Sequence, residues 1–339
     1  MKSDPILDKF LAAHSKIKTA NHVLIVSPAP PDADSITSCL LLSEYLKLPW
    51  LNKPHTLYCT QTVPQPEENL LLKFFKSDLL QFSLDLPRVH PTCIALVDYG
   101  NFKTAGLNAS DFMDAEFIGF DHHDQPADDF PENGLQIIAQ EAASTTALLY
   151  HYFCYIGVPI SKAMATYITV GILADTGRLT NPKANADALR IVANCIEKGI
   201  PWDKILEAMQ PRISKNRLHV WAQIALHSMS IGAYGFISAV VSKNNLNRWG
   251  GTAKDAESFL GWMQMLEDAR VTVLILEQGD REWKIALRSK VPREISVAKI
   301  ARRLGGGGHP HMAAAIWSGD PFDAEEILRK EVVSILQKS

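Results

Sequence analysis

Short apolar segments alternate with helical patterns along the first half of the chain, and this alternation is the feature that most constrains the fold. The apolar segments are short enough to be buried strands and lie at residues 22–27 (HVLIVS), 92–97 (TCIALV) and 116–120 (EFIGF). Helical patterns lie at residues 5–17, 35–46, 142–157 and 161–176, and Asp34 is expected to cap the second of them. The sequence therefore predicts an α/β fold with a mostly parallel sheet that is covered on both faces.

The second half of the chain has a different organisation. Residues 184–228 are helical throughout, and strand-like segments return at residues 236–241, 271–276 and 283–287. A run of glycines and a final helix near residues 323–337 complete this half. We therefore predict a first domain at residues 1–190, a helical linker at residues 191–228 and a smaller α/β domain at residues 229–339.

The composition excludes several classes of protein. Apolar residues make up 47% and charged residues 21% of the 339 residues, which is typical of a globular protein. A net charge of −3 argues against a basic surface that follows long duplex nucleic acid. The most apolar segment, residues 163–174, is shorter than the roughly 18 residues that a membrane span needs. The five cysteines are scattered without a CxxC pair, so we expect no disulfide framework and predict a reducing, cytoplasmic location.

Acidic and histidine side chains follow the predicted strands at the points where the strands end. In chain order they are Asp32 and Asp34 after the first strand, Asp98 after the second, Asp121, His122 and His123 after the third, and Asp175 at the end of the most apolar helix. The carboxyl ends of parallel strands border the crevice where ligands bind. These side chains are therefore expected to converge although they are far apart in the sequence.

Carboxylates that converge in this way repel one another unless cations neutralise them. Several carboxylates with one or two imidazoles suit Mn²⁺ or Mg²⁺ better than Zn²⁺, and they suffice for one ion or for two ions that share a carboxylate. Such ions can hold a phosphoryl oxygen and activate a water. Taken singly, each signal has a simpler explanation, since an Asp-x-Asp pair in a loop usually caps a helix. Their common position at the strand ends of one domain favours a metal site.

The same residues form a series of motifs that resembles a known family. The segments that resemble, in order, the four motifs of the DHH phosphoesterase superfamily are Pro31-Asp32-Ala33-Asp34, Val97-Asp98, Asp121-His122-His123 and Ala174-Asp175-Thr176-Gly177. The segments that resemble its associated substrate-binding domain are Arg288-Ser289 and Gly305-Gly306-Gly307-Gly308-His309. The architecture looks most like the group of nanoRNases and 3′-phosphoadenosine-5′-phosphate phosphatases. That group degrades very short oligonucleotides and depends on manganese.

The resemblance implies a role for each acidic or histidine side chain of the first domain. Asp32 would bind a first metal ion and Asp34 a second, Asp98 would bridge both, and the second site would be completed by His122 and Asp175. His123 would contact the substrate phosphate, so the implied catalytic residues are Asp98 and His123. One position departs from the family, because Pro28 stands where a histidine ligand is usual. This departure would weaken the first site and favour one tight ion over two.

Positive charge is concentrated beside the glycine run of the second domain. Between residues 281 and 303 lysine and arginine outnumber the acids, although the chain as a whole is acidic. Glycines let backbone N–H groups turn toward an anion, and Arg288 can offer a planar fork to a phosphate. The alternative interpretation is a flexible loop beside a solvated surface. The resemblance implies a substrate-binding set of Arg288, Ser289, Gly306, Gly307, Gly308 and His309, with no assigned role for His311.

We therefore expect a hydrolase that uses Mn²⁺, or Mg²⁺, and a metal-activated water to cleave phosphoester bonds. The implied substrates are short 5′-phosphorylated oligonucleotides, linear dinucleotides or 3′-phosphoadenosine 5′-phosphate, with neither long duplex nucleic acid nor a membrane as a partner. Family members of this size are often homodimers. One alternative is a phosphoanhydride hydrolase similar to family II pyrophosphatases and exopolyphosphatases, against which residues 305–309 argue. The other is a nucleotide-binding protein without activity, whose first metal site is degraded at Pro28.

Overall fold

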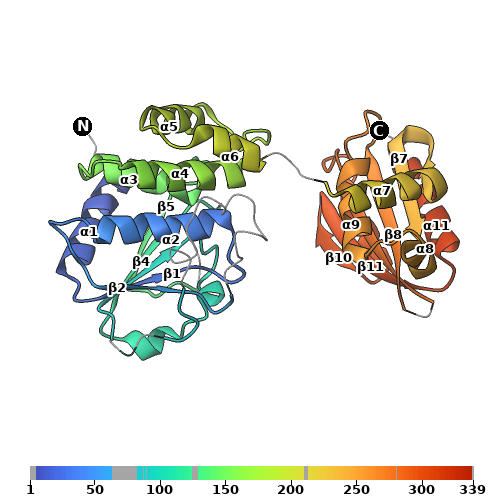
Figure 1. Cartoon of the computed structure of the whole chain (residues 1–339). Helices are drawn as coiled ribbons and strands as arrows, with labels where there is room; N and C mark the ends of the chain where they lie inside the picture. The colour runs from blue at the N-terminus through green and yellow to red at the C-terminus, as the bar shows by residue number, and fades with distance from the viewer. Residues whose placement is uncertain are drawn as a thin grey trace. The chain divides into compact units, whose positions relative to one another are not determined.

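The chain folds into two compact units, Met1–Pro211 and Arg212–Ser339 (Figure 1). The computed structural model describes residues 5–62, 82–86, 88, 90–123, 129–209, 213–279 and 281–337. Within these residues every helix is too short or too polar to cross a membrane. The boundary between the units lies inside the segment predicted as a helical linker.

A five-stranded sheet forms the centre of unit 1. Its strands, in spatial order, are β2 (His55–Tyr58), β1 (Val23–Val26), β3 (Cys93–Val97), β4 (Glu116–Asp121) and β5 (Leu135–Ile138). Every pairing is parallel, which confirms the predicted sheet. All residues of β1 and β3 are buried, as expected for central strands that are covered on both faces. The edge strands β2 and β5 are only partly buried and carry no comparable apolar run in the sequence.

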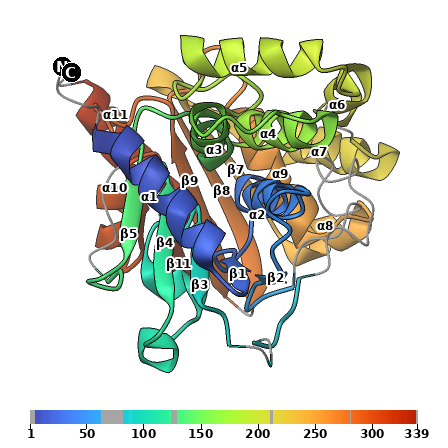
Figure 2. The same ribbon diagram turned by 90° about the vertical axis from the view of Figure 1, so that its left-hand side faces the viewer.

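The two faces of this sheet are covered differently. The helices whose side chains share one apolar cluster with the sheet are α1 (Pro5–Thr19), α2 (Ala33–Leu46), α3 (Thr145–Tyr155), α4 (Lys162–Asp175) and α5 (Ala186–Glu197). Helix α1 lies in the foreground of Figure 2. The other face packs against aromatic side chains between residues 99 and 130, a segment that contains the 3₁₀ helices Phe102–Ala105 and Ala109–Phe112. Because side chains alternate along a strand, Ile25 of β1 joins the first cluster and Leu24 the second.

The start of α2 corrects one sequence prediction, because Asp32 and not Asp34 caps this helix. Asp32 has the extended backbone of a cap, and its Oδ1 accepts a hydrogen bond from Ser35 N at 2.9 Å. Ser35 Oγ accepts in return from Asp32 N at 2.9 Å, which completes a capping box. Asp34 already lies in the first turn, where its side chain is fully buried. The Asp-x-Asp pair therefore contains one capping residue and one residue of the protein interior.

Unit 2 is built on a six-stranded mixed sheet. In spatial order its strands are β10 (Gly307–His309), β11 (Met312–Ser318), β9 (Glu282–Ser289), β8 (Val271–Gly279), β7 (Phe236–Val241) and β6 (Met229–Ile231). Strands β7 and β8 are parallel and the other neighbours are antiparallel. One face packs against α10 (Val297–Arg303) and α11 (Pro321–Leu336). The other face packs against α7 (Lys215–His227), α8 (Lys243–Arg248) and α9 (Ala253–Met263), which confirms a second α/β domain.

The helices predicted as a linker are divided between the two units. Helix α5 packs on unit 1, where Ile191 and Cys195 join the apolar cluster, and α6 (Trp202–Met209) contributes Ile205 to the same cluster. Helix α7 packs on unit 2 through Val220 and Ile224. The apolar face of each helix is therefore buried within one of the two units.

Candidate functional site

The ends of two strands and two helices bring the predicted metal ligands together in unit 1. Asp98 follows β3, His122 and His123 follow β4, Asp34 lies in the first turn of α2, and Asp175 ends α4. His122 Nε2 is 3.0 Å from Asp175 Oδ2 and 3.5 Å from Asp98 Oδ1. His123 Nδ1 is 3.9 Å from Asp98 Oδ1. The convergence expected from the strand ends is therefore present.

Two groups of these residues have ligand atoms close enough to hold a cation. Asp34, His122 and Asp175 form one group, and Asp98, His122 and His123 form the other. Within each group the ligand atoms lie within 4.8 Å of one another. Carboxylate oxygens combined with imidazole nitrogens suit Mn²⁺ or Mg²⁺. His122 belongs to both groups but faces them with one nitrogen, Nε2, so the residues fit a single cation, or two cations of which only one is bound by His122.

Among the described residues, the predicted ligand Asp32 belongs to neither of the two candidate metal-binding groups. One of its oxygens is engaged as the cap of α2, and its side chain is exposed. Burial is the main cause that raises the pKa of Asp98, and the charge of Asp32 adds to it, so Asp32 lies within electrostatic reach. Pro28 is buried, and its carbonyl oxygen accepts from Cys59 Sγ at 3.5 Å. Direct binding of a metal by Asp32 stays a prediction.

The electrostatics of the buried carboxylates favour a bound cation. Burial raises the pKa of Asp34 well above its usual range, and the charges of Asp98 and Asp175 raise it further. Burial likewise raises the pKa of Asp98 to about 6. Burial by itself would lower the pKa of His122, but hydrogen bonds to Asp175 and Asp98 raise it to about 10. The carboxylates thus need a positive neighbour, which a divalent cation would provide while leaving His122 neutral.

A backbone carbonyl fixes the orientation of His122. Its Nδ1 is 3.3 Å from the carbonyl oxygen of Ala142. A proton on Nδ1 donates to that oxygen and leaves Nε2 facing Asp98 and Asp175. The neutral imidazole would therefore present a lone pair to the place where the carboxylates converge.

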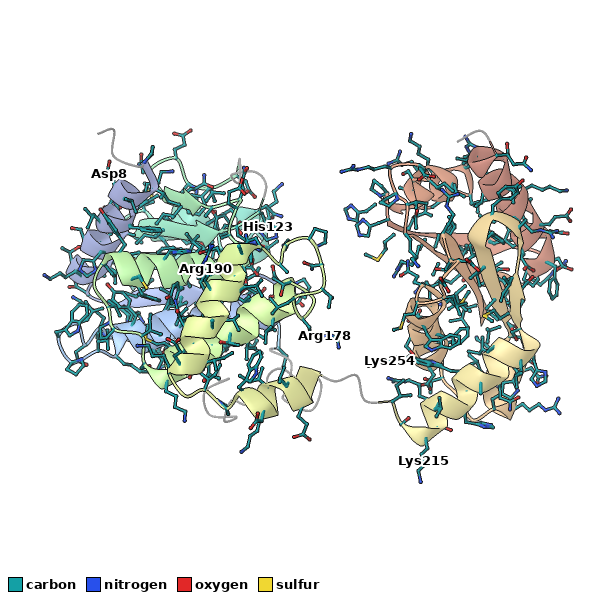
Figure 3. All side chains as sticks on the ribbon, turned by 90° about the horizontal axis from the view of Figure 1, so that it is seen from above. Asp8, His123, Arg178, Arg190, Lys215 and Lys254 are labelled. Carbon is teal, nitrogen blue, oxygen red and sulfur yellow. The ribbon has the colours of Figure 1, made fainter. Side chains whose placement is uncertain are left out.

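Asp121 holds the segment that carries the two histidines. Its Oδ1 accepts from His122 N at 2.8 Å and from His123 Nδ1 at 2.6 Å, and its Oδ2 accepts from Gly100 N at 2.9 Å. The hydrogen bond to Asp121 is the main cause that raises the pKa of His123. His123 is half-exposed and lies near the surface of unit 1 (Figure 3). It is therefore accessible to a ligand that enters from solvent.

Two threonines at the start of α3 contact the same carboxylates, and the sequence patterns single out neither. Thr145 N donates to Asp34 Oδ2 at 2.7 Å, and the Thr145 hydroxyl donates to Asp98 Oδ1 at 3.1 Å. Thr146 N and its hydroxyl donate to Asp34 Oδ1 at 3.2 and 2.9 Å. Ser144 caps α3 by accepting from Ala147 N at 3.1 Å. The sequence signal that could have indicated this role is the run of three hydroxyl residues, 144–146, at the start of the helix, because one hydroxyl is enough to cap it.

Unit 2 contains a pocket of about 360 Å³ against β9, β10 and β11. The predicted substrate-binding residues that line it are Arg288, Gly307, Gly308 and His309. Because side chains alternate along a strand, Lys284, Ala286 and Arg288 of β9 share the face that borders the pocket. The volume lies within the range of roughly 300–1,000 Å³ that is usual for small-molecule sites.

The other two predicted substrate-binding residues lie outside the lining of this pocket. Ser289 is on the opposite face of β9, where it is buried and its Oγ accepts from Val291 N at 3.2 Å. A Cβ at Gly306 would lie 2.1 Å from the carbonyl oxygen of Ala314, so this glycine allows β11 to approach closely. Both residues have structural roles, and their contact with substrate stays a prediction.

Arg288 provides the pocket with a cation that can bind an anion. Its Nη1 donates to the carbonyl oxygen of Leu287 at 3.1 Å, and no carboxylate of the described residues lies within 4.0 Å of its guanidinium. Burial lowers the pKa of Arg288, a cost that an anionic ligand would offset. Lys284, by contrast, is paired with Glu257 at 2.7 Å.

Comparisons with known proteins agree with this architecture. The sequence model of the DHH family, N-terminal domain, matches residues 22–172, and that of the DHHA1 domain matches residues 234–338. The bifunctional oligoribonuclease and PAP phosphatase NrnA of Thermus thermophilus is 26% identical over 304 residues, which are 89% of this chain and 86% of that protein. The Bacillus subtilis protein of the same name is 25% identical over 214 residues, 62% of this chain and 65% of that protein.

A solved structure agrees with the fold of the whole chain. The crystal structure of an exopolyphosphatase-related protein from Bacteroides fragilis superposes on this chain with a TM-score of 0.75 at 22% identity. The alignment covers 98% of this chain and 96% of the Bacteroides fragilis chain. The two matched domains follow one another along the chain and together account for both units. The chain therefore belongs to the DHH phosphoesterase family and is a hydrolase with a DHH domain followed by a DHHA1 domain.

Proposed function

We propose that this hydrolase cleaves phosphoester bonds in short 5′-phosphorylated oligonucleotides, linear dinucleotides or 3′-phosphoadenosine 5′-phosphate, with Mn²⁺ or Mg²⁺ as its cofactor. The observation that carries the proposal is the convergence of the buried Asp34, Asp98 and His122 with the partly buried Asp175. The activities named for the relatives from Thermus thermophilus and Bacillus subtilis support the substrate class.

The side chains of the metal centre have different roles in this proposal. Asp34, His122 and Asp175 would hold one cation, and Asp98 is grouped with His122 and His123, of which His123 is assigned to the substrate and not to the metal. A divalent cation bound by such ligands lowers the pKa of a water and stabilises charge that develops on a phosphoryl group. Asp98 belongs to the second group and lies 3.5 Å from His122, a member of both groups, which supports its predicted bridging role.

His123 contacts the substrate phosphate in this proposal. Asp121 accepts from Nδ1, so Nε2 is the nitrogen that remains for a ligand. The hydrogen bond to Asp121 also raises the pKa of His123, which favours the imidazolium form. A charged imidazole donates a strong hydrogen bond to a phosphate oxygen and offsets its negative charge.

In this proposal Arg288 and the glycine strand β10 of unit 2 bind a phosphate of the substrate. The guanidinium has the planar geometry that a terminal phosphate prefers and is not paired with a carboxylate of the described residues. A Cβ at Gly307 would meet no atom within 4 Å, so the strand leaves room for a ligand there. These residues position the substrate and take no part in bond cleavage.

The test is hydrolysis of a 5′-phosphorylated diadenylate by the full chain with added Mn²⁺, beside the Asp98→Asn variant as a control for contaminating nucleases. Asparagine keeps the shape of Asp98 and tolerates its left-handed backbone, at φ 52°, but lacks the charge. We expect turnover by the native protein and a loss of at least about a hundredfold in the variant. Equal rates for the two proteins would contradict the proposal.

Two further arms of this assay separate the alternatives. Inorganic pyrophosphate replaces the dinucleotide in the first, and faster hydrolysis of pyrophosphate would favour a phosphoanhydride hydrolase. In the second, binding of 3′-phosphoadenosine 5′-phosphate is measured by calorimetry beside its hydrolysis. Binding without turnover of any of these substrates would favour a nucleotide-binding protein whose first metal site is degraded.

A further inference from the structure

We propose that Thr145 is a positioning residue of the metal centre, because it ties together carboxylates from two different elements. Its backbone N donates to Asp34 of α2, and its hydroxyl donates to Asp98 at the end of β3. The inference rests on the metal centre of the proposed function. It adds the group that fixes where two of the ligands stand relative to each other.

The Asp34 carboxylate accepts hydrogen bonds from the backbone at the start of α3. The first N–H groups of a helix have no partner within the helix. Those of Thr145 and Thr146 donate to Oδ2 and Oδ1 of Asp34, at 2.7 and 3.2 Å. Asp34 is fully buried, so these donors replace the water that would otherwise solvate its charge. The partial positive charge of the helix N-terminus further favours the ionised carboxylate.

Thr145 extends this arrangement from Asp34 to Asp98. Its hydroxyl is fully buried and lies 3.1 Å from Asp98 Oδ1. The two carboxylates repel each other, since burial is the main cause that raises the pKa of Asp34 and the charge of Asp98 raises it further. A donor to each carboxylate from one residue holds both at a fixed separation. Without the hydroxyl, Asp98 keeps its contact with His122 but loses this restraint.

Helix formation does not account for the Thr145 hydroxyl. The cap of α3 is Ser144, whose Oγ accepts from Ala147 N at 3.1 Å. Threonine is a weaker helix former than alanine, so its presence in the first turn is not explained by propensity. Thr146 is a less specific probe than Thr145, because its hydroxyl also bonds Ser144 Oγ at 2.8 Å.

Helix α4 contributes space for the same arrangement. A Cβ at Gly171 would lie 2.4 Å from Asp34 Oδ1 and 2.3 Å from Thr146 Oγ1. A glycine inside a helix is less favourable than alanine, so a close approach is the physical reason for it here. Three helices thus meet at Asp34 with no room for an added methyl group.

The experiment compares Mn²⁺ binding and hydrolysis for the native full chain, Thr145→Val and Thr145→Ser. Valine removes the hydroxyl at nearly constant shape, and serine restores it. We expect valine to weaken Mn²⁺ binding, measured by calorimetry, by about 10–100-fold, the usual effect of losing a partner of a metal ligand. Saturating Mn²⁺ should recover part of kcat, and KM for the substrate should change by less than about twofold. Serine should behave like the native protein.

The matched control is Thr169→Val in α4. Thr169 is also buried, and its hydroxyl donates to the carbonyl oxygen of Ala165 at 2.8 Å and to neither carboxylate. It should bind Mn²⁺ like the native protein, which separates the proposed role from a general effect of valine. Thr145→Ala replaces Thr145→Val if the latter does not fold.

The outcomes distinguish this inference from the proposed function. Native affinity for Mn²⁺ in a folded variant that lacks the Thr145 hydroxyl would overturn the inference and leave the metal centre intact. Equal weakening in Thr145→Ser and Thr145→Val would also overturn it, because the methyl group and not the hydroxyl would then matter. A native protein that binds neither Mn²⁺ nor Mg²⁺ would overturn the proposed function itself.

Discussion

Three ionisable side chains of the site in unit 1, those of Asp34, Asp98 and His122, are buried and lie close together, whereas those of the pocket in unit 2 border open space. Asp34 is fully buried and Asp98 is 7% exposed, and burial is the main cause that raises the pKa of each. Arg288 is partly exposed and is not paired with a carboxylate of the described residues. In unit 1 the carboxylates repel one another, and a bound cation would reduce this repulsion. In unit 2 the guanidinium of Arg288 can bind an anion directly. We therefore expect substitutions in the two units to change different kinetic constants.

The largest effect is expected for His122→Gln, because His122 belongs to both ligand groups. Loss of this nitrogen should abolish high-affinity Mn²⁺ binding and lower kcat by more than about a hundredfold. The matched control is His151→Gln, since His151 is paired with Asp187 at the surface of the same unit. Calorimetry with Mn²⁺ and initial rates measure both variants. Similar losses of Mn²⁺ affinity and kcat in the two variants would mean that the buried site is no more sensitive than the surface of unit 1.

A pair of alanine substitutions in the glycine run separates scaffold from pocket in unit 2. Gly306→Ala places a Cβ 2.1 Å from the carbonyl oxygen of Ala314 and should lower the free energy of unfolding by about 1–3 kcal/mol. Gly307→Ala meets no atom within 4 Å and should leave that free energy nearly unchanged while raising KM. Urea unfolding and substrate titration test this pair. The comparison fails if Gly307→Ala is the more destabilising change.

Arg288→Ala should affect substrate binding without affecting the chemical step. The lost charge-assisted hydrogen bond corresponds to about a tenfold rise in KM, with kcat nearly unchanged. Lys299→Ala removes an exposed cation of α10 that does not line the pocket and should leave both constants as they are. A fall in kcat for Arg288→Ala with KM unchanged would show that unit 2 takes part in the chemistry.

The smallest effect concerns Asp255 of unit 2, whose pKa is lowered, in contrast to the pKa values of Asp34 and Asp98 in unit 1, which are raised. Its hydrogen bonds with Thr252 are the main cause, and the ion pair with Arg217 at 2.9 Å contributes. A carboxyl with a lowered pKa adds stability above its usual pKa of 3.8 and loses that stability as the pH falls through the lowered value. Because solvent screens this carboxyl, Asp255→Asn should cost no more than about 1 kcal/mol at pH 7.

The difference between native and Asp255→Asn proteins should shrink as the pH falls below 3.8 and the native carboxyl becomes protonated. Hydrogen exchange of the α9 amides at two pH values reports this difference for unit 2. A destabilisation that stays constant across that range would mean that the charge of Asp255 is not its source.

The strand ends were predictable because burial on both faces requires continuous apolar runs, as in β1 and β3, and because acids there stand out against them. The capping role of Asp32 was not predictable from its type, since Asp34 has the same side chain two residues later. Only the backbone geometry at the start of α2 decides between the two. Nor was it predictable from the sequence that Ser289 lies away from the pocket, because the direction of its side chain depends on the register of β9.

The sequence by itself determined the alternation of strands and helices, the order of the acidic and histidine motifs, and with them the α/β architecture and the family. These features are local, and hydrophobic burial together with side-chain chemistry is enough to specify them. The tertiary structure alone decided that Thr145 reaches both Asp34, at a sequence distance of 111 residues, and Asp98. It also decided which glycines border a pocket and which lie against a neighbouring strand. Such contacts depend on how whole elements pack, and no periodicity in the sequence encodes them.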